Sequence, residues 1–115
     1  MKVNFCKPFK AYDGKDAEMD KEVISTDGKK VIVTEKQMIN DFLALHLFNG
    51  AGLERTGKAD TDNQNKYVAY KLSQKIIAAK GIIEISVEEA AIVKQVASSM
   101  NPGGYAQIVD LIEGD

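Results

Sequence analysis

His46 and Cys6 are the only histidine and the only cysteine in this chain, and both residue types can serve as catalytic groups or metal ligands. A zinc site needs several such ligands, and a Cys-His or Ser-His pair needs its base beside the nucleophile. Neither residue has a partner of this kind nearby in the sequence, and Lys7 and Lys10 give Cys6 only a diffuse positive field. We therefore expect His46 on a helix face at the edge of the core and Cys6 as a small packing residue.

Acidic residues offer two further candidates. Glu88 and Glu89 are adjacent, so on a helix they point to different faces and cannot act together across a substrate. Asp60 and Asp62 begin a calcium-loop pattern, but Lys71 occupies its twelfth position, where a carboxylate is required. We expect one of these aspartates to cap a helix instead. The pattern predicts no catalytic residue, no metal and no cofactor, and therefore no enzyme.

Length and composition predict one domain over residues 1–115. The chain is 44% hydrophobic and 28% charged, which is typical of a soluble globular protein. No apolar run approaches the roughly 18 residues of a membrane span, and no hydrophobic signal region follows the first residues. A single cysteine favours a reducing cytoplasm, and the net charge of −2 argues against a nucleic-acid partner.

The first third of the chain predicts strands. Residues 2–6 alternate between apolar and polar side chains, as a short edge strand does. Two β-branched runs, residues 22–25 and 30–34, flank an Asp-Gly turn and form the clearest hairpin signal. The highly charged residues 15–21 are expected to be an exposed loop. The strand and the hairpin together should make one small antiparallel sheet.

Apolar periodicity predicts four helices, at about residues 35–48, 66–80, 87–100 and 102–113. Thr34 with Gln37, and Ser86 with Glu89, have the spacing of capping boxes at two helix starts. Gly81 should end the second helix in the left-handed conformation and precede a brief buried strand. The polar residues 50–65 are expected to be the most mobile part. The predicted class is α+β, a small N-terminal antiparallel sheet of a strand plus a hairpin packed against about four helices.

The end of the first helix is apolar on nearly all sides, because Leu45 and Phe48 widen its inward face. One small domain would have difficulty covering such a surface, which favours a protein partner or self-association into an oligomer. The region that follows is basic and could contribute to the same contact. The predicted interaction surface comprises Leu45, Phe48, Arg55, Lys58, Lys71 and Lys75.

Four segments carry a resemblance that spans nearly the whole chain: MKVNFCKPFKAYDGK, ALHLFNG, AYKLSQKIIAAKGIIEISVEEAAIVKQVASS and YAQIVDLIEG. The chain resembles small phage and prophage proteins of gut bacteria that are encoded among virion structural and assembly genes. The resemblance implies a non-enzymatic role in tail assembly or as a minor virion component, in the host cell cytoplasm or the virion. It assigns no functional residue. The alternative is a phage inhibitor of host defence that binds a small ligand or nucleotide, suggested by the basic residues between Arg55 and Lys80.

Overall fold

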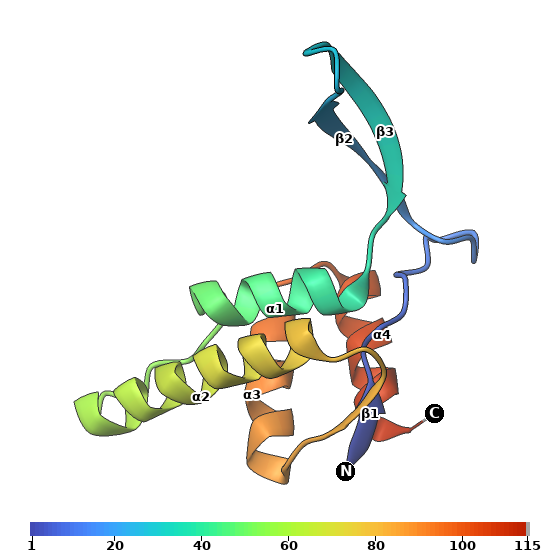
Figure 1. The fold of residues 1–115 in the computed structure, drawn as a ribbon. Coiled ribbons are helices and arrows are strands. Elements are labelled where there is room, and N and C mark those ends of the chain that lie inside the picture. The colour runs from blue at the N-terminus through green and yellow to red at the C-terminus, as the bar shows by residue number, and fades with distance from the viewer. Residues whose placement is uncertain (115) are drawn as a thin grey trace.

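The computed structural model describes residues 1–114, and Asp115, the last residue of the predicted domain, lies outside that range. Within residues 1–114, four helices and two small antiparallel sheets confirm the α+β class (Figure 1). In chain order the elements are β1 Lys2–Asn4, β2 Glu18–Ile24, β3 Lys30–Lys36, α1 Ile39–Asn49, α2 Ala59–Ala78, β4 Ile82–Glu84, α3 Val87–Ala97 and α4 Pro102–Glu113.

The four helices together with β1 and β4 form a helical body around one core. Helix α1 packs on α2 and α3, and α4 packs on α3 and β1. Each helix contributes a side chain with no exposed surface, namely Leu43, Leu72, Val93 and Ile108. Since these residues lie on the apolar stripes of four amphipathic helices, the stripes converge on a common interior.

The N-terminal strand pairs with β4 and not with the hairpin, so the single predicted sheet is wrong. Val3 lies opposite Ile83 in an antiparallel register. The Ile85 amide donates to the Met1 carbonyl at 2.8 Å, and the Met1 ammonium donates to the Ile85 carbonyl at 2.7 Å. The pairing follows from burial, because Val3 and Ile85 both need the apolar cover that the helices provide.

The predicted hairpin is present, but it projects from the helical body in place of packing against it (Figure 1). We call residues 18–36 the arm. Residues 25–29 join its strands, and they contain a turn in which the Gly28 amide donates to the Ser25 carbonyl at 2.9 Å. Gly28 has φ 82°, the left-handed conformation that such a turn requires. No residue of β2 or β3 is buried, and only Val23 and Val33 are half-buried.

Three backbone hydrogen bonds of 2.8 Å anchor the arm base. Phe9 donates to Gln37, Gln37 donates to Ala17, and Ala17 donates to Phe9, each to the carbonyl oxygen. The Phe9 ring is buried and meets the Phe42 ring edge-on, with 5.8 Å between centroids. The arm therefore begins at a fixed junction with α1.

Several predicted element ends are wrong where a longer-range contact overrides a local signal. Residues 18–21, expected in a loop, belong to β2 because they pair with β3. Thr34 likewise stays in β3 and donates its hydroxyl to Asp20, so α1 begins only at Ile39 without a side-chain cap. Gly81 is not left-handed, because α2 ends earlier through an extended Ala79.

Helix α2 begins at Ala59, so residues 59–65 are helical and not part of a loop. Asp62 does not cap this helix. Its carboxylate accepts the amide and the hydroxyl of Thr56, both at 2.8 Å. These hydrogen bonds lower the pKa of Asp62 and fix the segment that leads into the helix. The predicted Ser86–Glu89 capping box and the Pro102 helix start are confirmed.

Candidate interaction surfaces

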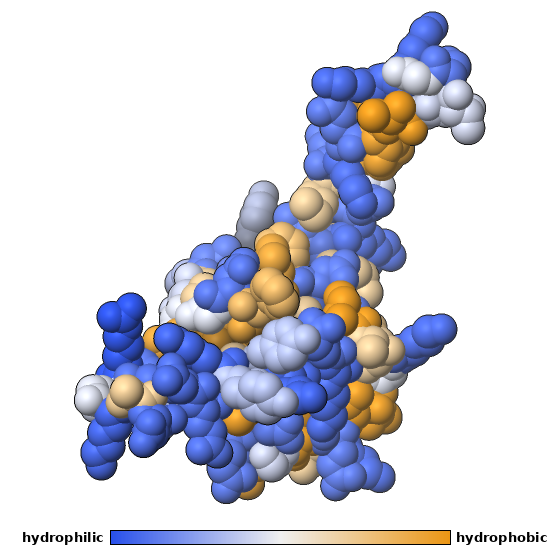
Figure 2. Space-filling model, turned by 60° about the vertical axis from the view of Figure 1, so that its left-hand side comes forward, coloured by the Kyte–Doolittle hydropathy of each residue, from blue (hydrophilic) through white to orange (hydrophobic). Residues whose placement is uncertain are grey.

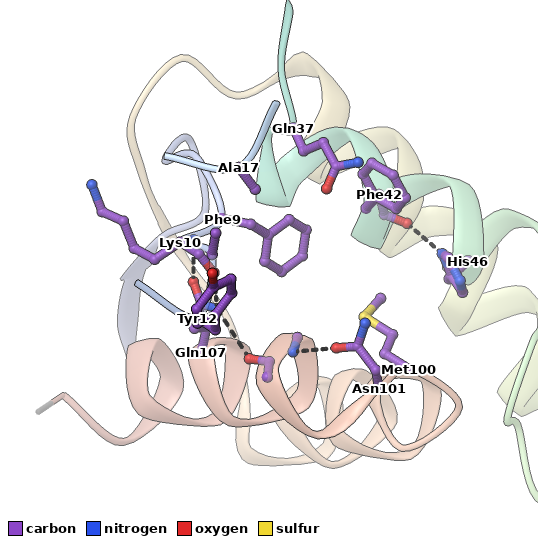
Figure 3. A pocket seen from close by; sticks show the side chains of 13 residues that line it. Phe9, Lys10, Tyr12, Ala17, Gln37, Phe42, His46, Met100, Asn101 and Gln107 are labelled. Atoms are coloured by element: carbon purple, nitrogen blue, oxygen red, sulfur yellow. Dashed lines mark hydrogen bonds between the residues drawn. The ribbon is translucent and has the colours of Figure 1, made fainter. Parts of the chain in front are cut away.

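A cavity of about 560 Å³ lies between the arm base, α1 and the start of α4 (Figure 3). The Phe9 ring projects into it, and Phe42, His46 and Met100 form another part of its lining. The His46 Nδ1 atom lies 2.7 Å from the Phe42 carbonyl, and its ring stacks on the Phe42 ring. His46 thus occupies the predicted position on a helix face at the core edge, where it is half-buried.

Most polar groups around this cavity hold the fold together. The Gln107 side chain accepts from the Lys10 amide at 2.7 Å and donates to the Lys10 carbonyl at 2.9 Å. The Asn101 side chain caps α4 by accepting from the Gly104 amide. Among the described residues that line the cavity, no nucleophile is hydrogen-bonded to a base. The cavity can hold a small molecule with apolar and polar groups, but its geometry offers no catalytic pair.

Cys6 lies outside this cavity and is half-buried. Its thiol donates to the Ala79 carbonyl at 3.2 Å, beyond the end of α2, which is the packing role expected from the sequence. Within residues 1–114, no group of three His, Cys, Asp or Glu side chains is placed to hold a metal ion. In the same part of the chain, no helix combines the length and apolar character needed to cross a membrane.

Aromatic and aliphatic side chains on α1 and α2 form an exposed surface, which we call the α1–α2 face. It comprises Leu45, Phe48, Tyr67, Tyr70 and Ile77. Neighbouring members on each helix are three or seven residues apart, which places them on the same side of that helix. The Phe48 and Tyr70 rings lie 6.1 Å apart and join the two helices. Lys71 places its ammonium 5.5 Å from the Tyr67 ring centre.

The six residues of the predicted interaction surface divide into two groups. Leu45 and Phe48 are more than half exposed on the α1–α2 face, and Lys71 lies at its border. Arg55 and Lys66 line a cavity of about 370 Å³ beside Phe48, but Glu54 and Asp62 line it too, so the positive charge of this cavity is balanced.

The remaining two lysines do not complete that surface. Lys58 is the residue before α2 and makes no side-chain cap there. Lys75 turns toward β4 and α3, where its ammonium donates to the Glu84 carbonyl and lies 3.9 Å from the Glu89 carboxylate. The predicted basic patch is therefore not a continuous surface.

The arm is a third surface, and the sequence did not predict its exposure. Cross-strand pairing places Met19, Val23, Val31 and Val33 on one side of the hairpin, and Ile24 and Ile32 on the other. Ile32 is 72% exposed and Ile24 is 74% exposed. Figure 2 shows orange, apolar atoms on the arm among blue ones, apart from the helical body. A sequence signal did exist, since charged residues occur on both sides of the hairpin and leave neither side suited to a core.

Opposite charges support the base of this arm. Asp16 forms ion pairs with Lys10 and with Lys36, the latter at 2.9 Å. The Lys10 hydrogen bond, followed by that of Lys36, holds the pKa of the Asp16 carboxyl below its ordinary value, and Asp16 raises the pKa of Lys36. All three side chains touch solvent, so these pairs orient the arm more than they stabilise the body.

Comparison of the chain with protein-family models, curated proteins and solved structures gives no match. We therefore infer its function from the three surfaces just described.

Proposed function

We propose that this protein is a non-enzymatic assembly or structural accessory of a phage particle, and that it acts by binding other proteins through its arm. The observation that supports this proposal is the exposure of both strands and both sides of the hairpin. An isolated two-stranded hairpin is at best marginally stable in water, and exposed apolar clusters commonly mark protein contacts. A partner that covers the arm accounts for both features.

The α1–α2 face supports the same class of function from a second side. Its exposed aromatic rings belong to the residue types that are enriched in protein interfaces. Tyrosine in particular offers a large contact area with few torsions to immobilise. The arm and this face can thus serve as two attachment points in an assembly.

The test is a chain with a shortened arm. An Asn-Gly turn replaces residues 18–36 and joins Ala17 to Gln37, which already form a hydrogen-bonded pair suited to a two-residue turn. The purified chains serve as bait in extracts of phage-producing cells, and mass spectrometry identifies the captured virion proteins. We expect the full-length chain to capture them and the shortened chain to lose them, with unchanged helical circular dichroism.

A second variant, Leu45→Ser with Phe48→Ser, separates the two surfaces. Both side chains are more than half exposed, so the variant should fold. If the shortened chain captures the same virion proteins as the full-length chain, the arm is not the binding element. If only the α1–α2 variant loses them, the binding surface is that face and the proposal is wrong about the arm.

The cavity at the arm base supports the second candidate function, a phage inhibitor of host defence that binds a small ligand. Its lining joins aromatic rings to the His46 imidazole, a composition common in ligand pockets. A thermal-shift screen against nucleotides and cyclic dinucleotides tests it, because a ligand at a hundred times its Kd adds about 2.7 kcal/mol of stability. A shift that His46→Gln abolishes would support this candidate, and an absence of shifts would remove it.

A further inference from the structure

The hydrogen-bond pattern of the arm fixes which backbone groups are free. Bonds from the Ser25 amide to the Lys29 carbonyl and from the Gln37 amide to the Ala17 carbonyl mark the two ends of the ladder. Because bonded and non-bonded pairs alternate in an antiparallel ladder, the odd-numbered residues of β3 bond to β2. The amides and carbonyls of the even-numbered residues, Lys30, Ile32, Thr34 and Lys36, therefore point outward along an open edge.

The corresponding edge of β2 is poorly suited to pairing with a second copy of itself. Its outward-pointing residues are Glu18, Asp20, Glu22 and Ile24. Antiparallel self-pairing there brings Asp20 opposite Glu22, or Glu22 opposite Glu22, or Asp20 opposite Asp20, depending on the register. Like charges directly opposite one another destabilise a strand pair, so this edge resists self-association.

The edge of β3 has one self-complementary register, centred on Ile32. In that register Ile32 faces its own copy, Val31 faces Val33 of the other chain, and Lys29 faces Glu35 of the other chain. Every outward-pointing backbone group from Lys30 to Thr34 then finds a partner. Centring the pair on Val33 would oppose Lys30 to Lys36, and centring it on Val31 would oppose Asp27 to Glu35, so either shift brings like charges together.

We propose that two copies of this chain associate through β3, antiparallel and centred on Ile32, to form a four-stranded sheet with β2 strands at its outer edges. The inference rests on the proposed function only in taking the arm as the binding element. Each apolar cluster of Met19, Val23, Val31 and Val33 becomes continuous with that of the second copy. The acidic outer edges of β2 then oppose further growth, so the assembly closes as a dimer.

We call the contact between the two β3 strands the seam. It is small, so association should be weak and visible only at high concentration. Sedimentation velocity over roughly 10 µM to 1 mM protein should show a reversible monomer–dimer equilibrium, a range suited to transient contacts. The dimer should be elongated, because the two helical bodies lie at opposite ends of the joined arms. A strict monomer throughout this range would overturn the proposal, and so would open-ended growth, which indicates pairing of β2 with β3.

Charge reversal tests the contacts. Glu35→Lys places like charges across the seam twice, as does Lys29→Glu, and each should raise the dimer Kd by about tenfold. The double variant restores both pairs in exchanged form and should restore the Kd. Lys21→Glu is the matched control, because it breaks the 3.9 Å ion pair of Lys21 with Glu35 inside the arm without changing the seam. Weakening by Lys21→Glu equal to that by Glu35→Lys would contradict the assignment.

Cysteine cross-linking tests the register in a Cys6→Ser background. Ile32→Cys faces itself across the two-fold axis at about 5.5 Å between Cα atoms, within the span of a disulfide. It should form covalent dimers under mild oxidation much faster than Val33→Cys, which faces residue 31 of the other chain. Faster cross-linking of Val33→Cys would overturn the register.

The outcomes separate this inference from the proposed function. A monomeric chain whose shortened-arm variant loses virion proteins keeps the function and rejects the dimer. A dimer that Glu35→Lys weakens, combined with unchanged capture by the shortened chain, keeps the dimer and rejects the function.

Discussion

The helical body and the arm contain the same kinds of apolar side chain, but only the body covers them. Ile85 in the core of the body is 2% exposed, whereas Ile32 on the arm is 72% exposed. Burying an isoleucine contributes about 1.5–3 kcal/mol, a contribution that the arm forgoes at several positions. The body therefore supplies nearly all of the stability, and the arm is a separable element.

The difference also appears in how each region uses its backbone. Most amides of α1–α4 bond within their own helix, and the open edges of the β1–β4 pair are only three residues long. The arm leaves two strand edges without a partner, a state that natural proteins commonly limit with charges or cover with a partner. Because the arm projects from the body, the molecule measures 52 × 33 × 25 Å, which is long for its mass.

Hydrogen exchange should give the largest difference between the two regions. Amides in the middle of α2 and α3, such as those of Leu72 and Val93, should open only with free energies near the global value, about 5–15 kcal/mol. Ladder amides of the arm should open with only about 0–2 kcal/mol, because no other element holds them. The measurement requires dilute protein, at which two copies do not pair. Equal protection in both regions would mean that the arm is held by contacts other than those described.

Matched isoleucine truncations should give the next largest difference. Ile85→Ala removes a buried side chain and should lower the free energy of unfolding in urea by about 2–5 kcal/mol. Ile32→Ala removes an exposed one and should change it by no more than about 0.5 kcal/mol. A large loss for Ile32→Ala in dilute protein would show that the arm folds cooperatively with the body.

The sequence predicted best those features that depend on neighbouring residues. The Ser86–Glu89 capping box and the Gly28 turn are both present, because each is decided within a few residues. The α+β class followed from adding such local signals together. Exposure of Leu45 and Phe48 was also readable, since helical periodicity separates one face from another.

Features decided by distant residues escaped prediction. The pairing of Val3 with Ile83 joins the two ends of the chain, and no local signal favours it over pairing with the hairpin. Thr34 has a good capping-box spacing, but its strand pairs with Asp20 and continues. The exposure of the arm was missed because an alternating pattern reports a strand without reporting what covers it. Charges such as Lys21 and Glu22 on successive positions were the available warning.

Glycine substitutions should have smaller effects that also differ between the body and the arm. Gly52 and Gly28 both have positive φ, 77° and 82°, so alanine is strained by about 1–2 kcal/mol at either position. At Gly52 the added Cβ also meets the Gln95 carbonyl oxygen at 2.8 Å, in the body. Gly52→Ala should therefore lower global stability by about 2–4 kcal/mol.

Gly28→Ala is the matched control, because nothing lies within 4 Å of its added Cβ. It should leave global unfolding in urea almost unchanged and reduce only the amide protection of the arm. Equal global losses for both variants would contradict the separation of arm and body.

Protonation of Asp16 should have the smallest effect and should be confined to the arm base. Lys10 and Lys36 lower the folded-state pKa of this carboxyl below its ordinary 3.8. The ion pairs of Asp16 with the two lysines are therefore fully present above pH 3.8, and they are lost as the pH falls through the lower pKa of the folded state. Titration of the side-chain carboxyl carbon by NMR should show the lowered pKa, and high salt should raise it toward its ordinary value by screening both ion pairs. Nitrogen relaxation of the arm amides should show increased motion over the same pH interval. Asp16→Asn should show that motion at every pH, and a carboxyl that titrates at or above 3.8 would mean that the two lysines do not orient the arm.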